Sequence, residues 1–302
     1  EILRCLVGSE MCIRDRNVGA CITDLVERTP GIVAFVPQQF IGSSGAVRLL
    51  PDNTISLKDV LAGAEWFPTA TPAPQFGFLP LITGTLWVSL FAILIALPFG
   101  LAVAVYMSEV ANHKIRNLMK PIIELLSGIP SVVYGFFGLI VIVPFLQKVF
   151  DLPVGESGLA GSIVLAIMAL PTIITVTEDA MRNCPRAMRE ASLALGASQW
   201  QTIYKVVIPY SISGITSGVV LGIGRAVGET MAVLMVTGNA AVIPHTILEP
   251  LRTIPATIAA ELGEAPAGGA HYEALFLLGV VLFFISLLIN FTVEAVSSGK
   301  RK

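Results

Sequence analysis

The stretch LPLITGTLWVSLFAILIALPFGLAVAVYM, residues Leu79 to Met107, decides the fold because it is long, apolar and free of charge. No Asp, Glu, Lys, Arg or His occurs anywhere between Glu65 and Glu109. About 20 apolar residues in a helix cross the hydrocarbon core of a bilayer. Such a span must be helical, because lipid offers the backbone no hydrogen-bond partner. The stretch therefore predicts a transmembrane helix over residues 79–107.

Further apolar runs make this an all-α, polytopic transmembrane helical bundle. Only 13% of the 302 residues are charged, whereas a soluble domain carries about 25%, so lipid must cover much of the surface. The net charge of -2 and the absence of a basic tract give no indication of nucleic-acid binding. We expect a transmembrane domain over residues 79–297 with five visible spans, at about 79–107, 121–146, 158–179, 206–236 and 274–296.

The basic residues of the short connections set the orientation. Ten lie on one side of a five-span path: Lys114, Arg116, Lys120, Arg182, Arg186, Arg189, Lys205, Lys300, Arg301 and Lys302. Only Lys148 and Arg252 lie on the other side. This predicts a cytoplasmic loop at 182–209, a cytoplasmic tail at 298–302 and an acidic outward loop at 238–272.

The N-terminal region has no feature that would place it across a membrane. Residues 1–16 resemble a translated sequencing-adapter read, and we expect them to be non-native; an ordinary polar N-terminus is the alternative. Residues 17–78 are expected to be extracytoplasmic. Because no signal peptide or earlier span is visible, the sequence predicts that a first transmembrane helix is missing.

The loop 182–209 combines an amphipathic helix with a turn. Pro185 suits a helix start, apolar residues follow at helical spacing, and Gly196 permits a sharp turn. The pattern predicts a helix-turn-helix elbow whose apolar face could dock into a groove on a partner. A polar loop lying on the membrane surface is the alternative.

An Arg and a Glu interrupt the fourth apolar run. Arg225 and Glu229 share an arc of about 80° with Gly214, Gly218 and Gly222 if the run is one helix. Glycines at this spacing let another helix approach closely, and charges in a span usually face a polar path or each other. The pair is therefore either part of a substrate pathway or an i, i+4 salt bridge that fixes helix packing.

The elbow resembles the EAA loop of ABC importer permeases. Glu190, Ala191 and Ser192, then Gly196, then a hydrophobic residue, a spacer, Ile208 and Pro209 keep the spacing of that motif, with Ser192 in place of the second Ala. In the family this loop docks on the ATPase subunit. The chain has no GxxxxGK[ST] phosphate-binding loop, so the resemblance implies a separate P-loop ATPase.

Several segments resemble PstC-type phosphate permeases, namely 76–89, 128–139, 222–239 and 271–290. The resemblance covers about residues 57–296 and implies the type I ABC importer fold in a bacterial inner membrane. It implies transport roles for Arg225 and Glu229, together with a second, PstA-type permease and a periplasmic phosphate-binding protein. An importer of another oxyanion or small solute is the alternative function. An intramembrane enzyme or a scaffold is a third.

Other polar residues give weaker signals. Glu178 and Asp179 close the third run, either as part of a cytoplasmic gate or at a solvated interface. The three histidines are far apart in the sequence and form no HExxH motif. We therefore expect no metal, no cofactor and no catalytic residue.

Overall fold

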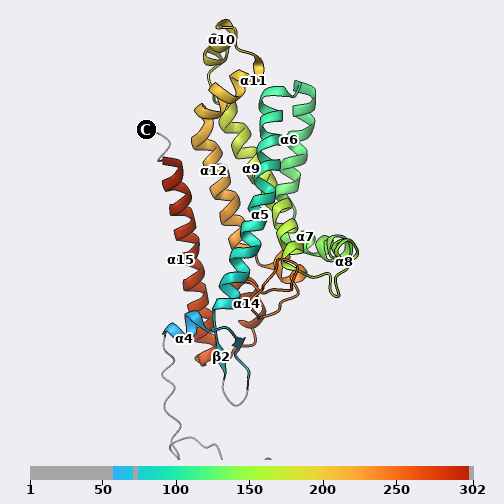
Figure 1. The fold of residues 1–302 in the computed structure, drawn as a ribbon, viewed down its shortest axis with the longest axis vertical. Helices are drawn as coiled ribbons and strands as arrows, with labels where there is room; N and C mark the ends of the chain where they lie inside the picture. The colour runs from blue at the N-terminus through green and yellow to red at the C-terminus, as the bar shows by residue number, and fades with distance from the viewer. Residues whose placement is uncertain (1–56, 71–73, 299–302) are drawn as a thin grey trace, which may run out of the picture. The chain divides into compact units, whose positions relative to one another are not determined.

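The computed structural model describes residues 57–70 and 74–298, and this part of the chain is largely helical (Figure 1). The predicted non-native segment 1–16, most of the segment 17–78 and nearly all of the tail 298–302 lie outside the described residues. In chain order the elements, with π-helical turns written η, are α4 Leu57–Ala62, β1 Trp66–Phe67, β2 Gln75–Phe76, α5 Leu79–Val105, η2 Tyr106–Val110, α6 His113–Gly128, α7 Ser131–Phe137, η3 Gly138–Ile142, α8 Val143–Phe150, α9 Gly158–Arg182, α10 Arg186–Ala194, α11 Gln199–Thr202, η4 Ile203–Val207, α12 Ile208–Gly228, α13 Met231–Val236, α14 Ile254–Glu261 and α15 Ala270–Ser298.

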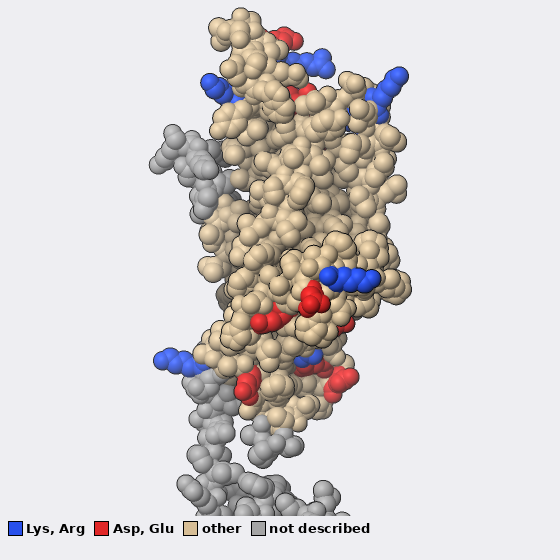
Figure 2. Space-filling model, turned by 45° about the vertical axis from the view of Figure 1, so that its right-hand side comes forward, with Lys and Arg blue, Asp and Glu red and all other residues tan. Residues whose placement is uncertain are grey.

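Five helical segments of the described chain are long and apolar enough to cross a membrane: Leu79–Val110, Ser131–Phe150, Gly158–Arg182, Gln199–Gly228 and Ala270–Val293. Figure 1 shows α10 and α11 at one end of the bundle, here called the elbow end, and β2 with α14 at the other, the hairpin end. On the face drawn in Figure 2, a broad band without charged side chains separates two charged ends. Such a band is the surface that a bilayer requires.

The second predicted span is not one continuous helix. The expected segment 121–146 is interrupted between α6 and α7, where Ile129 is extended (φ -69°, ψ 129°). The cause is Pro130, which lacks an N–H and disfavours helical geometry in the residue before it. Leu126, four residues earlier, thereby loses a helical donor for its carbonyl. The Tyr134 hydroxyl of α7 donates to that carbonyl at 2.7 Å instead.

The fourth predicted span, 206–236, is also interrupted. Helix α12 ends at Gly228, and Glu229 is extended (φ -71°, ψ 134°) before α13 begins. The Thr230 hydroxyl donates to the Gly228 carbonyl at 3.3 Å. The interruption follows a glycine, which favours a helix interior less than other residues except proline. The two interruptions divide their spans into segments that pack together: a Cβ on Gly135 of α7 would lie 2.9 Å from Cα of Ala232 in α13.

Helix α9 is the centre of the bundle and α15 is its periphery. In the most apolar window of α9, 61% of residues are buried inside the structure, against 11% in α15. Glycines allow the close approach of α9 to its neighbours: a Cβ on Gly100 of α5 would lie 2.8 Å from Ile173, and one on Gly161 of α9 would lie 2.5 Å from Thr237. The exposed side of α15 carries large apolar residues suited to lipid, namely Phe276, Phe283, Phe284, Leu288 and Phe291.

The hairpin end is closed by elements that the sequence did not predict. Strands β1 and β2 form a short antiparallel hairpin that pairs Trp66 with Phe76. The outward loop folds over the start of α9, where the Leu159 N–H donates to the Ile247 carbonyl at 2.7 Å. A short helix of eight residues, α14, follows. Its backbone is tied to the first span, because the Ile254 N–H donates to the Thr85 hydroxyl at 3.0 Å.

Candidate functional site: the broken spans and the elbow

Arg225 lies in the last turn of α12, one turn before that span is interrupted. Its side chain is partly exposed, and within residues 57–70 and 74–298 it makes neither a hydrogen bond nor an ion pair. Tyr134, beside the interruption of the other broken span, lies within electrostatic range of the guanidinium. A cation is favoured at a helix C-terminus, but an unpaired one deep in a membrane protein normally serves a polar path. The guanidinium of Arg225 thus has no anionic partner among the described residues.

The salt bridge between Arg225 and Glu229, one of the two alternatives left open by the sequence, is not formed. The prediction assumed one continuous helix, and the end of α12 at Gly228 removes Glu229 from that helical face. Glu229 lies instead before α13, where its Oε1 atom is 3.5 Å from the backbone nitrogen of Ala232. A carboxylate is favoured beside the free N–H groups at the start of a helix. Arg225 therefore lies at the C-terminal end of α12, whereas Glu229 lies at the N-terminal end of α13, and the two charges do not compensate each other.

The three glycines of the predicted packing face all point at α9. A Cβ on Gly222 would lie 2.8 Å from Ile173, one on Gly218 would lie 3.1 Å from the Thr177 hydroxyl, and one on Gly214 would collide with the Cβ of Ala180. The stripe thus packs within the chain. On another side of α12, Gly224 and Gly228 have no described atom within 4 Å of a built Cβ. At these two positions α12 is therefore not covered by any described part of the chain.

The elbow is a helix-turn-helix, as the motif predicted in outline. Pro185 precedes α10, and Gly196 has φ +82°, a conformation that side-chain-bearing residues rarely adopt. Ser198 starts α11 with a capping box: its hydroxyl accepts from the Gln201 N–H, and the Gln201 side chain accepts from the Ser198 N–H. The Ser192 and Thr202 hydroxyls, 2.9 Å apart, join the two arms. The turn is therefore well defined.

The motif residues of the elbow are mostly accessible. Glu190, Ala191 and Gly196 are exposed, Ser192 is half-buried, and exposed Pro209 lies in the first turn of α12. No residue of α10 is buried. Large apolar side chains project beside them, with Leu195 89% exposed, Trp200 68% and Tyr204 73%. Leu195 lies in the turn, whereas Trp200 and Tyr204 lie at the start of the fourth span, so the exposed apolar side chains extend from the elbow onto that span.

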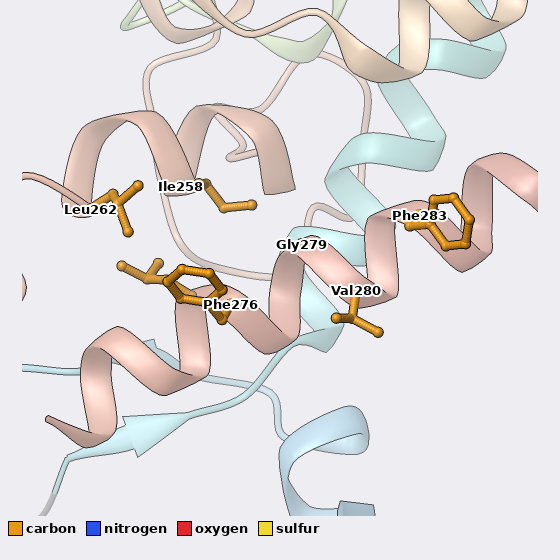
Figure 3. A pocket seen from close by; sticks show the side chains of 7 residues that line it. Ile258, Leu262, Phe276, Gly279, Val280 and Phe283 are labelled. Atoms are coloured by element: carbon orange, nitrogen blue, oxygen red, sulfur yellow. The ribbon is translucent and has the colours of Figure 1, made fainter. Parts of the chain in front are cut away.

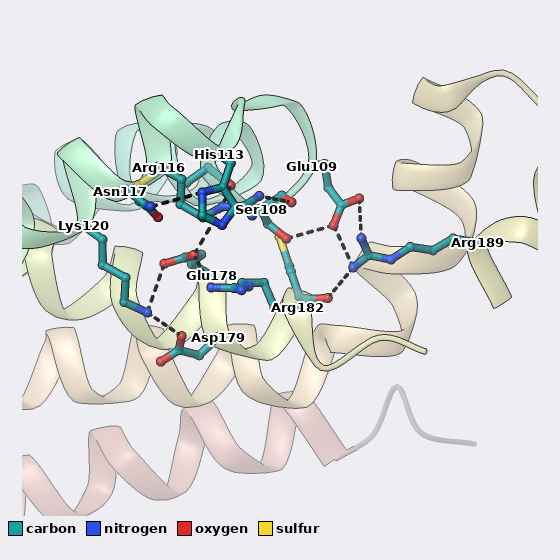
Figure 4. Close-up of polar contacts among 12 residues, drawn as sticks. Ser108, Glu109, His113, Arg116, Asn117, Lys120, Glu178, Asp179, Arg182 and Arg189 are labelled. Carbon is teal, nitrogen blue, oxygen red and sulfur yellow. Dashed lines mark hydrogen bonds and ion pairs between the residues drawn. The ribbon is translucent and has the colours of Figure 1, made fainter. Parts of the chain in front are cut away.

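Charged residues beneath the elbow form a network that sequence reasoning did not find (Figure 4). Glu178 of α9 is 1% exposed, so the expectation of a solvated position for it is wrong. Three cations surround it: its carboxylate oxygens lie 4.0 Å from Arg116 Nε, 3.8 Å from Lys120 Nζ and 3.5 Å from Arg182 Nη1. A buried carboxylate is tolerable only when it is compensated in this way.

The second half of the network surrounds Glu109 of η2. Its carboxylate is bound by Arg189 of α10, with Arg189 Nη2 2.9 Å from Oε1 and Nη1 3.0 Å from Oε2. Glu109 stands out in the sequence as the first charge after the long apolar run, which is the signal that could have drawn attention to it. Its partner 80 positions away could not have been named from spacing.

A third polar cluster lies at the hairpin end around Glu261 of α14. This carboxylate accepts from Nε1 of Trp66 at 3.0 Å and from Arg252 Nη1 at 2.6 Å, and it lies 2.9 Å from His271 Nε2. The cluster ties the hairpin, the outward loop and α15 together. Trp66 and His271 had not been predicted to meet.

A pocket of about 380 Å³ opens near the same end, between α14 and α15 (Figure 3). Every residue that lines it is apolar or glycine: Ile258, Leu262, Leu275, Phe276, Gly279, Val280 and Phe283. An oxyanion needs hydrogen-bond donors or positive charge, and this pocket offers neither. It is not the anion site.

Comparison with known proteins identifies the family. Residues 96–302 match the model of the family described as "Binding-protein-dependent transport system inner membrane component". The chain belongs to this family. It is therefore a multi-pass protein of the inner membrane and a component of an ABC transporter. The all-α bundle predicted from the apolar runs is confirmed.

Curated relatives of this inner membrane component are similar over most of their length. A probable ABC transporter permease protein of Bacillus subtilis is 40% identical over 87% of this chain and 84% of the relative. The phosphate transport system permease protein of Mesorhizobium japonicum is 38% identical over 76% and 75%. The corresponding protein of Mycobacterium tuberculosis is 38% identical over 71% and 70%.

Solved structures show the same fold. The methionine ABC transporter MetNI in an inward-facing conformation matches with a TM-score of 0.55 and 21% identity, over 74% of this chain and 94% of that one. A bacterial ABC transporter that imports alginate matches with a TM-score of 0.56 and 19% identity, over 74% and 80%. At these identities the likeness concerns the fold alone.

Proposed function

We propose that this protein is a permease subunit of an ATP-driven importer of inorganic phosphate. The observation that carries the proposal is Arg225, an arginine inside a membrane span with no partner among the described residues. Similarity to phosphate transport system permeases at 38% identity supports phosphate as the substrate. The chain is then a transport component without catalytic activity, and ATP hydrolysis takes place on a separate subunit.

The chemistry of phosphate fits the surroundings of Arg225. A guanidinium presents a rigid fork of donors that matches two phosphate oxygens. Interrupted helices at membrane depth are tolerated only where they are buried in protein or line a water-filled cavity, and α12 ends at Gly228, three residues after Arg225. Glu229, the first residue after α12, supplies a negative charge that would weaken binding of the anion to Arg225 and so allow its release.

Three partners follow from this proposal. The exposed elbow would dock on the P-loop ATPase through Glu190, Ala191 and the apolar side chains beside them. The open side of α12 at Gly224 and Gly228 would face a second permease, so that the path runs between the two. A periplasmic phosphate-binding protein would deliver substrate to the hairpin end. ATP-driven closure of the ATPase pair would move the elbows and expose Arg225 to each side in turn.

The test is Arg225→Gln in the assembled transporter, reconstituted in proteoliposomes with its binding protein. Loss of the charged fork should lower ATP-dependent phosphate uptake by about tenfold or more, because a charge-assisted hydrogen bond contributes roughly 1.5–3 kcal/mol. Glu229→Gln controls for assembly and local structure only, since the amide oxygen can still accept from the Ala232 N–H; it also removes the charge proposed to aid release, so uptake is compared with the wild type. Wild-type uptake by Arg225→Gln would refute the role of this residue. Failure of that variant alone to assemble would point to packing.

Import of another oxyanion is the second candidate, favoured by the 40% identity to a permease whose name carries no substrate. ATP turnover of the reconstituted complex separates the two. Stimulation by phosphate but not by sulfate or molybdate supports phosphate import, and the reverse pattern supports the alternative.

A further inference from the structure

Helix α10 of the elbow has very few attachments to the membrane spans. None of its nine residues is buried, and its Ser192 is bonded to Thr202, which belongs to the elbow itself. Among the described residues, the side-chain hydrogen bonds that join α10 to the first and third spans come from Arg189 alone. Apart from its short chain connections to α9 and α11 and its packing against α11 and η4, this exposed helix is thus joined to the first and third spans by one side chain.

Arg189 holds the ends of two different spans. Its guanidinium grips Glu109 of η2 through two parallel contacts of 2.9 and 3.0 Å. Nη2 also donates to the Met181 carbonyl, in the last turn of α9, at 2.9 Å. Two-point arginine–carboxylate pairs fix direction as well as distance. Figure 4 shows Arg189 reaching across from the elbow toward Glu109.

The pair is shielded from water, which makes it strong and directional. The Glu109 side chain is 8% exposed and that of Arg189 is 24%. Ser108 Oγ donates to Glu109 Oε1 at 2.8 Å, so the carboxylate is held on its other side too. Low local dielectric strengthens such contacts relative to exposed pairs.

The receiving end, η2, is itself braced to the next helix. Arg116 of α6 donates from Nε to the Met107 carbonyl at 2.8 Å and from Nη2 to the Ser108 carbonyl at 2.9 Å. The second arm of the elbow adds a weaker contact, from Gln199 Nε2 to the Glu109 carbonyl at 3.3 Å. A displacement of α10 along the Arg189 contact would therefore be passed to the first span, to α6 and to α9.

We propose that the Arg189–Glu109 pair is the mechanical linkage that converts movement of the elbow into movement of the spans. Both residues are positioning residues and touch neither ATP nor phosphate. The inference rests on the proposed function, because the elbow moves only if an ATPase binds it. Breaking the pair uncouples ATP turnover from uptake while the elbow surface that meets the ATPase stays intact.

The experiment uses the full transporter in proteoliposomes and measures ATP turnover and phosphate uptake in the same preparation. Glu109→Gln and Arg189→Gln should retain the ATPase on copurification and lower phosphate uptake per ATP hydrolysed by about tenfold, the factor that one lost charge-assisted contact can produce. The double variant should be no worse than the more severe single variant, since partners in one contact are not additive.

Asp179→Asn is the matched control. Asp179 lies at the same end of α9 and pairs with Lys120 at 3.2 Å, but its side chain is 55% exposed, and exposed pairs contribute little. It should keep the wild-type ratio of uptake to ATP turnover. Arg189→Lys keeps the charge without the fork and should give an intermediate ratio.

The outcomes separate this inference from the proposed function. If the wild-type complex imports no phosphate, the proposed function fails. If it imports phosphate and the Glu109 and Arg189 variants keep its uptake per ATP, the linkage is refuted. Additive losses of uptake per ATP in the double variant would also overturn the linkage. So would loss of assembly in Arg189→Lys as well as in both Gln variants, because it would show a role in folding.

Discussion

Replacing single glycines of α12 by alanine tests how this helix is packed. The perturbation is Gly214→Ala, compared with Gly224→Ala on the same helix. A Cβ at position 214 would collide with the Cβ of Ala180, an atom fixed to the α9 backbone, whereas a Cβ at position 224 meets no described atom within 4 Å. The two variants therefore differ in packing and in little else.

The expected magnitude follows from that difference. Each substitution gains about 1 kcal/mol of helix propensity, and this gain cancels between the two variants. Overpacking against a backbone that cannot move aside costs about 1–3 kcal/mol, and only Gly214→Ala incurs it. The free energy of unfolding of Gly214→Ala should thus lie about 1–3 kcal/mol below that of Gly224→Ala.

The assay is unfolding of the purified chain in mixed micelles by titration with denaturing detergent. A second substitution, Ala180→Gly, removes the atom with which the new methyl collides. Gly214→Ala should then cost less in the Ala180→Gly background than in the wild type, which is a positive coupling energy. Equal stability of the two glycine variants, or no coupling to Ala180→Gly, would refute the packing described for α12.

Three other outcomes are expected. The His245 N–H donates to Glu249 and holds the pKa of that carboxyl below its ordinary value of 4.5. The stabilisation by this contact is complete above pH 4.5 and is lost as the pH falls further. Hydrogen exchange at the His245 N–H, corrected for its intrinsic rate, should therefore accelerate at low pH in the wild type but not in Glu249→Gln. Glu261→Ala leaves the buried indole N–H of Trp66 without its acceptor and should lower the free energy of unfolding by about 1–3 kcal/mol, read from thermal unfolding; an unchanged melting temperature would contradict this. Gly196→Ala introduces a side chain at φ +82°, which costs about 1–2 kcal/mol, and should weaken copurification of the ATPase without altering unfolding of the spans.

The apolar runs were sufficient to predict the bundle, because hydrocarbon leaves the chain few choices. The run from Leu79 to Met107 became α5 and η2 without interruption. The same reasoning joined α6 to α7 and α12 to α13, because hydropathy does not register where a helix is interrupted. Pro130 was a sequence signal for the interruption between α6 and α7. The only sequence signal for the interruption between α12 and α13 was a glycine, Gly228.

The site was harder to predict than the fold, since it depends on contacts between distant positions. The elbow could be anticipated because its turn is local and Gly196 marks it. Glu178 could not be assigned correctly from its own neighbours, since two of the cations that compensate it come from α6. The separation of Arg225 from Glu229 likewise depends on where α12 ends, which an assumed regular helix conceals.

The hydroxyl of Tyr134 has a consequence for how the second span can bend. It and the Ile129 N–H both donate to the carbonyl of Leu126, which Pro130 leaves without its usual donor. Only the hydroxyl contact crosses the joint, because Ile129 lies on the α6 side of Pro130. Opening the joint between α6 and α7 would therefore cost one hydrogen bond, about 0.5–1.5 kcal/mol, a resistance that the same joint without a tyrosine would lack.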